Sequence, residues 1–164
     1  MKKIILSAAL LLSFSCAFAQ TALPDLTKFP VATPKEATAA NKNALQTAEY
    51  LLTNPIDKNH ADRMDAARYL MEWMESSPDF TFSFDANFAA VCKEVDISAL
   101  YIASMVNYQV SNNVKEATKA ESVLIWETFA KYITNPANNV KQKDEVKKLA
   151  EAYKAGKLKE YLAR

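Results

Sequence analysis

The sequence predicts an all-α protein, and three observations support this class. The chain of 164 residues contains one glycine, whereas globular proteins average about 7% glycine. Because tight hairpin turns depend on glycine, this composition argues against a β-rich fold. Apolar residues recur at helical spacing, and the prolines fall between these periodic segments, where a helical protein tolerates them. We therefore predict a single helical domain over residues 34–164, built as a bundle or a short array of helical hairpins with about five helices.

Residues 1–19 have the three-part pattern of a cleaved signal peptide. A basic start is followed by an apolar run over residues 4–14, and a small-x-small site stands at 17–19. The apolar run is shorter than the roughly 20 residues that span a bilayer. The pattern predicts cleavage between Ala19 and Gln20, and export of the mature chain to the periplasm or the outside of the cell.

Cys16 raises the alternative of a lipid-anchored protein. A lipoprotein signal needs a small residue directly before the cysteine, and Ser15 satisfies this requirement. It also needs an aliphatic residue three positions before the cysteine, where Ser13 stands, and Phe14 is bulky. The sequence therefore favours cleavage after Ala19 over lipid attachment.

The balance of charge excludes some partners and leaves two roles open for the C-terminal segment. Removal of Lys2 and Lys3 with the leader leaves 18 basic and 19 acidic side chains, which gives no reason to expect nucleic-acid binding. Residues 43–136 carry 7 basic and 13 acidic side chains, whereas residues 141–164 carry 8 and 4. The basic tail is either docked on the acidic body or solvated, or it forms a contact surface for an anionic envelope component.

The residues that most often carry chemistry are scarce. Cys92 is the one cysteine left after cleavage and has apolar neighbours, so we expect a small buried side chain and no intrachain disulfide. His60 is the single histidine, and without a second His or a Cys pair no ordinary zinc site is expected. Phosphate-binding loops need several glycines. We predict a protein without enzymatic activity, cofactor or metal.

Each predicted element has a local signal. Residues 20–33 form an extended arm whose Leu23, Leu26 and Phe29 lie against the body. Thr33 and Glu36 form a capping box for the first helix, and Gly156 ends the last long one. The predicted helices cover 34–53, 55–76, 85–111 with Asp85 as cap, 114–134 with Asn113 and Glu116 as capping box, 139–155, and a short tail with Leu158, Tyr161 and Leu162.

Two of these helices have informative faces. In the helix at 55–76, a stripe at helical spacing is predicted to be buried, although an exposed Met cluster would be an adaptable binding surface. The helix at 85–111 is uncharged from Ile97 onward, and its Ser, Asn and Gln residues argue against membrane insertion. It is therefore predicted to be the central helix of the domain. The predicted buried stripe of the helix at 55–76 consists of Met64, Ala67, Leu70, Met71 and Met74.

A short sequence occurs twice, at the predicted ends of two helices. Thr-Asn-Pro stands at 53–55 and again at 134–136, each time after an apolar helix and before a polar one. The echo marks either two related helical hairpins on either side of the central helix, or a common way to end one helix and begin the next.

The segment at 77–85 contains the candidate binding residues. Phe80, Phe82 and Phe84 alternate with Thr81 and Ser83, so an extended chain would place the three rings on one side. The rings either staple the segment to the core, or form an aromatic platform or an edge for a partner strand. Trp73 is expected to line the same hollow. The predicted function is a binding or scaffolding module for an unknown protein of the cell envelope, and the alternative is a carrier of a small apolar ligand.

Overall fold

A computed structural model describes residues 21–56 and 61–164 of the chain. These residues form eight α-helices and two short 3-10 helices, with one isolated bridge between Thr81 and Glu116, so the all-α prediction is confirmed. The predictions for the leader, for Cys16, for the cut between Ala19 and Gln20 and for His60 fall outside the described residues. The α-helices are α1 (Pro34–Ala39), α2 (Asn41–Thr53), α3 (Ala61–Ser76), α4 (Ala86–Val91), α5 (Val95–Asn112), α6 (Lys119–Thr134), α7 (Asp144–Lys154) and α8 (Leu158–Leu162), and the 3-10 helices are η1 (Leu26–Lys28) and η2 (Pro136–Asn138).

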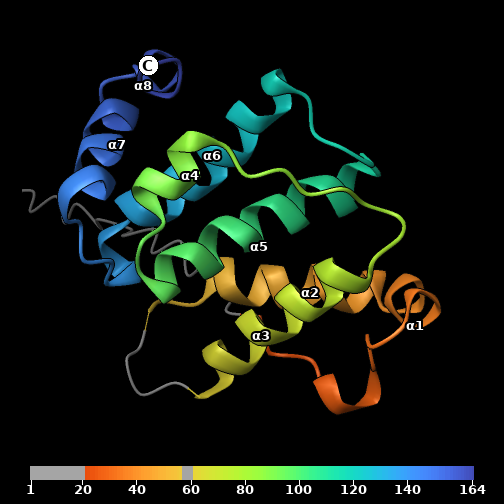
Figure 1. Cartoon of the computed structure of the whole chain (residues 1–164). Helices are drawn as coiled ribbons and strands as arrows, with labels where there is room; N and C mark the ends of the chain where they lie inside the picture. Colours follow the sequence, from red (N-terminus) through yellow and green to blue (C-terminus); the bar gives the residue numbers. More distant parts are fainter. Residues whose placement is uncertain (1–20, 57–60) are drawn as a thin grey trace, which may run out of the picture.

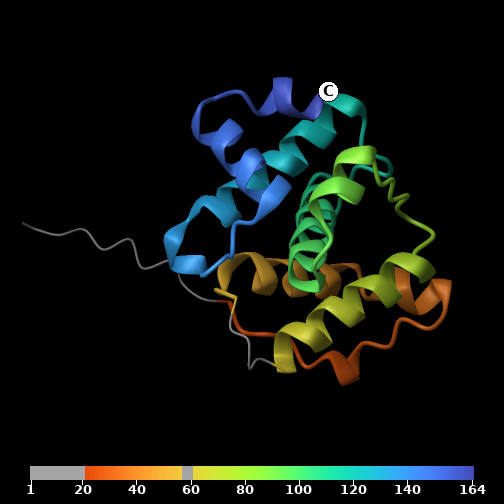
Figure 2. The ribbon, with the colours of Figure 1, turned by 60° about the vertical axis from the view of Figure 1, so that its left-hand side comes forward.

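Helix α5 lies at the centre of the bundle. Helices α2 and α3 pack on one side of it and α6 on the other, with α7 and α8 beyond α6 (Figures 1 and 2). Ten residues of α5 are buried, distributed over most of its circumference, which confirms the predicted central helix. No helix in the described ranges is both long and apolar enough to cross a membrane.

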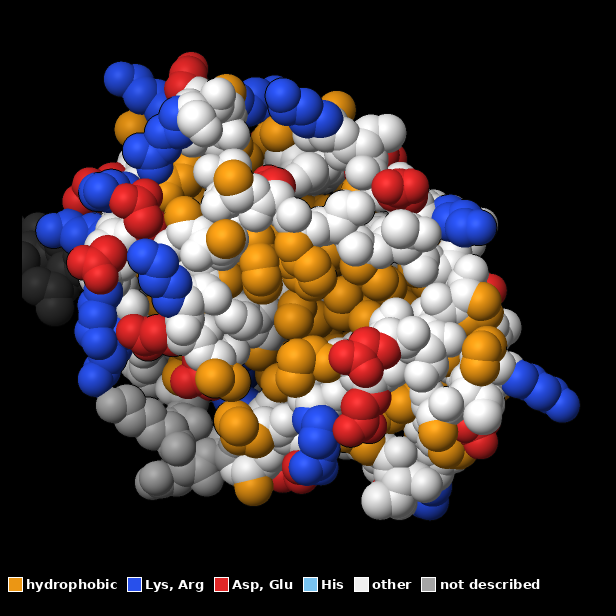
Figure 3. All heavy atoms as spheres, in the orientation of Figure 1, with side chains coloured by type: hydrophobic (Ala, Val, Ile, Leu, Met, Phe, Trp, Pro, Cys, Tyr) orange, Lys and Arg blue, Asp and Glu red, His pale blue; other side chains and the backbone are white. Residues whose placement is uncertain are grey.

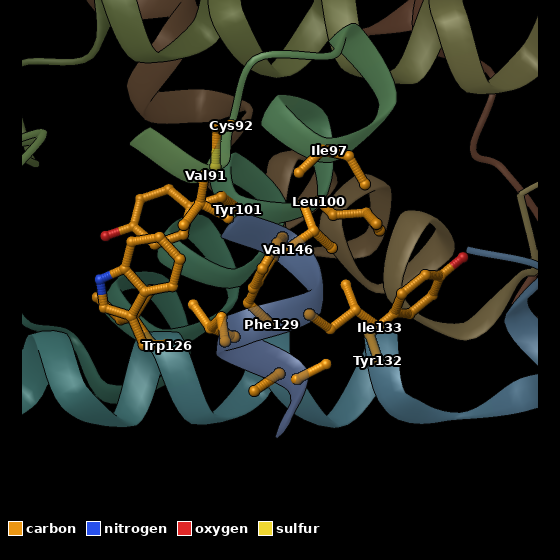
Figure 4. Packing of buried hydrophobic residues seen from close by; sticks show 14 of the residues in the cluster. Val91, Cys92, Ile97, Leu100, Tyr101, Trp126, Phe129, Tyr132, Ile133 and Val146 are labelled. Carbon is orange, nitrogen blue, oxygen red and sulfur yellow. The ribbon is translucent and has the colours of Figure 1, made fainter. Parts of the chain in front are cut away.

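Two clusters of buried apolar residues lie on the two sides of α5. The first joins α4, α5, α6, α7 and α8. In Figure 4, side chains of α5 and α6 face each other across this cluster, and Val146 of α7 lies among them. The second joins α1, α2, α3 and α5, and Leu23, Leu26 and Phe29 of the N-terminal segment pack against it.

Three predicted helix ends are confirmed. The Thr33 hydroxyl accepts a hydrogen bond from the Glu36 N–H, and the Glu36 carboxylate accepts one from the Thr33 N–H. The Asp85 side chain caps α4, because its Oδ1 accepts a hydrogen bond from the Phe88 N–H at 2.8 Å. Gly156 has a φ of +70° and ends α7, because this left-handed conformation costs glycine little.

The predicted helix at 34–53 is wrong in one respect, because it breaks at Ala40 into α1 and α2. In a continuous helix the Ala37 carbonyl would accept the Asn41 N–H. The Trp73 indole N–H donates to this carbonyl instead, at 3.0 Å. A contact with α3 therefore competes with the helix for one of its own acceptors.

The predicted helix at 85–111 is likewise divided, by a turn at Cys92–Glu94. The Ser98 hydroxyl donates to the Cys92 carbonyl at 2.8 Å and stabilises this turn. Cys92 is buried in the first cluster, as predicted, and burial raises the pKa of its thiol to about 12. The thiol therefore stays protonated at neutral pH.

Three predicted helix starts lie too early. Asn113 does not cap α6 but ends α5 in the left-handed region, and the capping box of α6 is formed by Thr118 and Glu121. Both sites have the same sequence pattern, and residues 114–117 are instead used for a contact with the 77–85 segment. Helix α7 begins at Asp144 rather than at 139, and Pro55 lies outside helical structure ahead of α3.

The buried face of α3 differs from the predicted stripe by a rotation of about one residue around the helix axis. Met64 and Met71 are 56% and 45% exposed. The buried face instead contains Arg63 and Trp73, at 4% and 0% exposure. One guanidinium nitrogen of Arg63 donates to the Leu51 and Asn54 carbonyls at the end of α2. The full set of buried residues on α3 is Arg63, Ala66, Ala67, Tyr69, Leu70 and Trp73.

The two Thr-Asn-Pro turns meet in the structure. The Tyr132 hydroxyl donates to the Asn54 carbonyl at 2.5 Å, and the Ile56 N–H donates to the Asn138 carbonyl at 3.0 Å. Each turn thus satisfies polar groups of the other, and the C-terminal ends of α2 and α6 are joined by these bonds.

The C-terminal segment is attached to the body by its apolar side. Leu149 and Ala150 of α7 are fully buried, while Lys147 and Lys148 on the same helix are exposed. Lys148 pairs with Glu145 within the segment at 2.6 Å. This arrangement supports a docked helix with a solvated basic face.

Candidate functional site

The segment at 77–85 crosses the bundle in an extended form between α3 and α4 (Figure 1). The Thr81 N–H donates to the Lys115 carbonyl at 2.7 Å. The Gln109 side chain amide of α5 donates to the Thr81 carbonyl at 3.0 Å and to the Lys115 carbonyl at 3.1 Å. Gln109 is 1% exposed, so a buried amide joins the two crossing segments.

Two of the predicted site rings belong to the core. Phe80 and Phe82 have ring centroids 5.8 and 5.7 Å from that of Trp73. Trp73 is fully buried and Phe80 is 8% exposed, while Phe82 is half-buried. These residues bring the segment onto the second cluster, which matches the staple interpretation for this end of it.

Phe84 does not join these two rings. It is 48% exposed, and its ring lies 4.4 Å from that of Phe88 in α4. The separation has a local cause, because Asp85 begins α4 and the extended conformation ends there. Phe88 in turn contacts Tyr101 of α5 at 5.3 Å. The exposed Phe84 ring therefore packs on Phe88, and Phe88 packs on Tyr101 of the first cluster.

A hollow of about 450 Å³ opens beside Phe84. It lies where the 77–85 segment, α5, the first turns of α6 and the C-terminal residues meet. The polar rim includes Asp85 and Ser122, and the floor is apolar. The hollow is lined by Thr81, Ser83, Phe84, Asp85, Ala86, Asn87, Tyr101, Met105, Gln109, Ala117, Thr118, Lys119, Ser122, Ile125, Leu162, Ala163 and Arg164.

Tyr101 and Asp85 are the titratable groups of the hollow whose surroundings the structure defines most closely. Burial raises the pKa of Tyr101, and the negative charge of Asp85 raises it further, so this hydroxyl keeps its proton at neutral pH. Asp85 accepts hydrogen bonds from the Phe88 N–H and, at 3.4 Å, from the Trp126 indole. In the described parts of the chain, no three His, Cys, Asp or Glu side chains are grouped to hold a metal ion.

The outer edge of the segment offers unused backbone groups. Thr81 directs its N–H and C=O toward Lys115 and Gln109. Because backbone groups alternate along an extended chain, those of Phe82 point the other way, and Phe84 stands at the end of the extended stretch. Neither residue forms a backbone hydrogen bond with any described residue. This edge resembles the free side of a sheet strand.

Sequence reasoning identified Phe84 but not the α5 residues that line the hollow with it. Tyr101 and Met105 are buried residues of the central helix α5, and they also line the hollow. The signal in the sequence was Gln109, a large amide at helical spacing from Met105 in an uncharged helix. Such a residue needs partners when it is buried, and here its partners are the two crossing segments.

Searches against protein-family models, curated proteins and solved structures found no match to this chain.

Proposed function

We propose that this protein is an exported, non-enzymatic binding module of the cell envelope that takes an extended peptide of a partner protein along residues 82–84. The observation that carries the proposal is the combination of a free backbone edge at Phe82 and Phe84 with the hollow beside Phe84. Strand addition draws affinity from main-chain hydrogen bonds and specificity from pockets for alternate side chains. The chain has both features at one place.

The support beneath Phe84 fits this role. Rigid aromatic residues that are exposed in the free protein are frequent anchors of binding interfaces. The Phe84 ring is held by Phe88 and Tyr101, so little conformational entropy is lost when a partner covers it. The polar groups on the rim, such as Asn87 and Ser122, are placed to fix the orientation of a bound side chain.

Phe84→Ala is expected to weaken peptide binding by at least tenfold, because hot-spot truncations cost about 2 kcal/mol or more. The probe is a peptide selected from a displayed random library on the mature protein, with its affinity measured by fluorescence anisotropy. Leu124→Ala is the matched control, since Leu124 is 45% exposed on α6 and does not line the hollow.

The same peptide tests strand addition directly. N-methylation of alternate backbone nitrogens on one edge should abolish binding, whereas methylation of the other edge should leave it unchanged. Equal binding of both methylated peptides, or an unchanged affinity for Phe84→Ala, would show that the 82–84 edge is not the peptide site.

The proposal includes export, and this part has its own test. Native protein from the envelope or the medium should begin at Gln20, either free or cyclised to pyroglutamate, because the 17–19 site precedes it. Intact mass and N-terminal sequencing check this result. A lipid-modified Cys16 or an uncleaved Met1 would contradict it.

The hollow also supports a second candidate, a carrier of a small apolar ligand. Its apolar floor of Tyr101, Met105 and Ile125 and its volume of about 450 Å³ are within the range of small-molecule sites. Anilinonaphthalene sulfonate is a suitable probe. The Trp126 indole donates to Asp85, which lines the hollow, so the tryptophan fluorescence would respond to bound dye. Met105→Trp should fill the floor and abolish dye binding if the hollow is a ligand site. Dye binding that Met105→Trp leaves unchanged would remove the carrier.

A further inference from the structure

A second cavity opens between the C-terminal halves of α2 and α6. Its volume is about 460 Å³, which is within the range of small-molecule sites. Helices α2 and α6 and the turns that follow them supply most of its lining, and α5 contributes Asn107. The cavity shares no lining residue with the Phe84 hollow. It is named the α2–α6 cavity here.

The walls of the α2–α6 cavity are fixed by bonds between distant parts of the chain. The Tyr132 hydroxyl donates to the Asn54 carbonyl, and the Ile56 N–H donates to the Asn138 carbonyl. The Asn138 side-chain amide donates in turn to the Tyr132 carbonyl at 2.9 Å. Leu52, which also lines the cavity, packs against both apolar clusters. A cavity held in this way loses little conformational entropy when a ligand enters.

Three of the eight polar side chains that line the cavity are left for a ligand. They are Glu49 of α2, Asn107 of α5 and Lys131 of α6. None of these three side chains has an ion-pair or hydrogen-bond partner among residues 21–56 and 61–164. The other five already form hydrogen bonds within the protein, and they are Thr53, Thr128, Tyr132, Asn135 and Asn138.

The three side chains without partners differ in charge, and their helices have a definite order. Glu49 offers a carboxylate and Lys131 an ammonium group, while the half-buried Asn107 amide can both donate and accept. Helix α5 packs against both α2 and α6 and lies between them (Figures 1 and 2). The amide therefore comes from the element between the two that carry the charges. A dipeptide has the complementary groups in the same order, because its peptide group lies between its ammonium and its carboxylate.

We propose that the α2–α6 cavity binds a dipeptide with apolar side chains. The ammonium group of the dipeptide meets the Glu49 carboxylate, its peptide group meets the Asn107 amide, and its carboxylate meets the Lys131 ammonium group. Hydrogen bonds in which one partner is charged are stronger than neutral ones, so the two ends supply most of the specificity. The apolar lining residues available to the side chains of the dipeptide are Leu52, Pro55 and Ala137.

The observations favour a dipeptide over simpler ligands. A lone anion would face the Glu49 carboxylate, and a lone cation would face the Lys131 ammonium group. A free amino acid has both charges but no peptide group for Asn107. Figure 3 shows a contrasting surface over α5, where apolar side chains gather in a hollow and charged side chains lie around it. The α2–α6 cavity differs because both charges and the amide line one cavity.

The test titrates the isotope-labelled mature protein with L-alanyl-L-leucine and follows amide chemical shifts by NMR. The amides of Glu49, Asn107 and Lys131 should shift, and those of residues 82–84 should not. Acetylation of the dipeptide amino group and amidation of its carboxylate should each weaken binding at least tenfold, because each removes one contact between charged groups. Free L-leucine should also bind at least tenfold more weakly, because it has no peptide group.

Three variants assign the contacts. Glu49→Gln should bind the free and the acetylated dipeptide equally, because the contact that acetylation removes is already lost. Lys131→Gln should likewise bind the free and the amidated dipeptide equally. Asn107→Leu should weaken dipeptide binding about tenfold and leave leucine binding unchanged. Lys42→Gln is the matched control, because Lys42 is exposed on α2 and does not line the cavity, and it should bind like the parent protein.

The three altered side chains lie outside the buried core, so the variants are expected to keep the thermal midpoint of the parent, which circular dichroism checks. Phe84→Ala should leave dipeptide binding unchanged, which separates the α2–α6 cavity from the proposed peptide site. Absence of shifts at millimolar dipeptide would overturn the proposal. Equal affinity of the parent for leucine and the dipeptide, or the same loss on acetylation in Glu49→Gln as in the parent, would overturn it as well.

Discussion

Trp73→Ala should lower the free energy of unfolding by about 3–5 kcal/mol, the usual range for deletion of a buried large aromatic ring. Trp73 is fully buried, and it contacts Phe80 and Phe82 from the other side of the second cluster. Its indole N–H also donates to the Ala37 carbonyl at the break between α1 and α2. The change therefore removes the ring on which three separate segments pack. Domains of this size have total stabilities of about 5–15 kcal/mol, so the loss is a large part of the whole.

Urea denaturation followed by circular dichroism measures this effect. Trp73→Phe is the graded control, because it keeps an aromatic ring and removes the indole N–H, and it should cost less than Trp73→Ala. Leu124→Ala, at an exposed position on α6, should change stability by less than about 0.5 kcal/mol. A loss below about 1 kcal/mol for Trp73→Ala would mean that Trp73 is not part of the core.

Gln109→Leu should lower the free energy of unfolding by about 1–2 kcal/mol, because it removes two hydrogen bonds of a buried amide, each worth about 0.5–1.5 kcal/mol, while keeping the size of the side chain. The Gln109 amide donates to the carbonyls of Thr81 and Lys115, and leucine offers these oxygens nothing. The 77–85 segment would also lose its main attachment to α5. The Thr81 amide, bonded to the Lys115 carbonyl, should exchange its hydrogen faster than in the parent protein.

Denaturation curves and amide hydrogen exchange read out the two effects separately. Asn112→Ala is the matched control, because the Asn112 amide also donates to a carbonyl but is exposed. It should cost less than about 0.5 kcal/mol and leave exchange at Thr81 unchanged. Normal protection of Thr81 in Gln109→Leu would show that the crossing of the two segments does not depend on this amide.

Local chemistry predicted the helical class and several helix ends. Thr33 with Glu36, Asp85 and Gly156 act through hydrogen bonds and backbone preferences within a few residues, so their effects can be read from the chain directly. The uncharged stretch of α5 likewise identified the central helix, because a helix without charges needs neighbours on several sides. The sequence at 77–85 identified the segment with the candidate site, since its alternating rings are incompatible with an amphipathic helix.

The remaining features depend on contacts between segments distant in the sequence. Helix α1 ends at Ala39, where the Ala37 carbonyl accepts both the Ala40 N–H and the Trp73 indole N–H, and α6 begins at Lys119, after residues 114–117 that lie beside Thr81. Both places have sequence patterns that also suit the alternative, so only tertiary packing decides between them.

The candidate binding site and the buried face of α3 show the same division. By itself the sequence determined an all-helical chain, its main caps, and Phe84 and the methionines as candidates for burial or binding. Only the tertiary structure decided that Phe84 and Met71 are exposed while Trp73 and Phe80 are buried. The physical reason is that a helix can rotate by one residue at small local cost, and the burial of Ala66, Leu70 and Trp73 in the second cluster fixes which face of α3 turns to solvent.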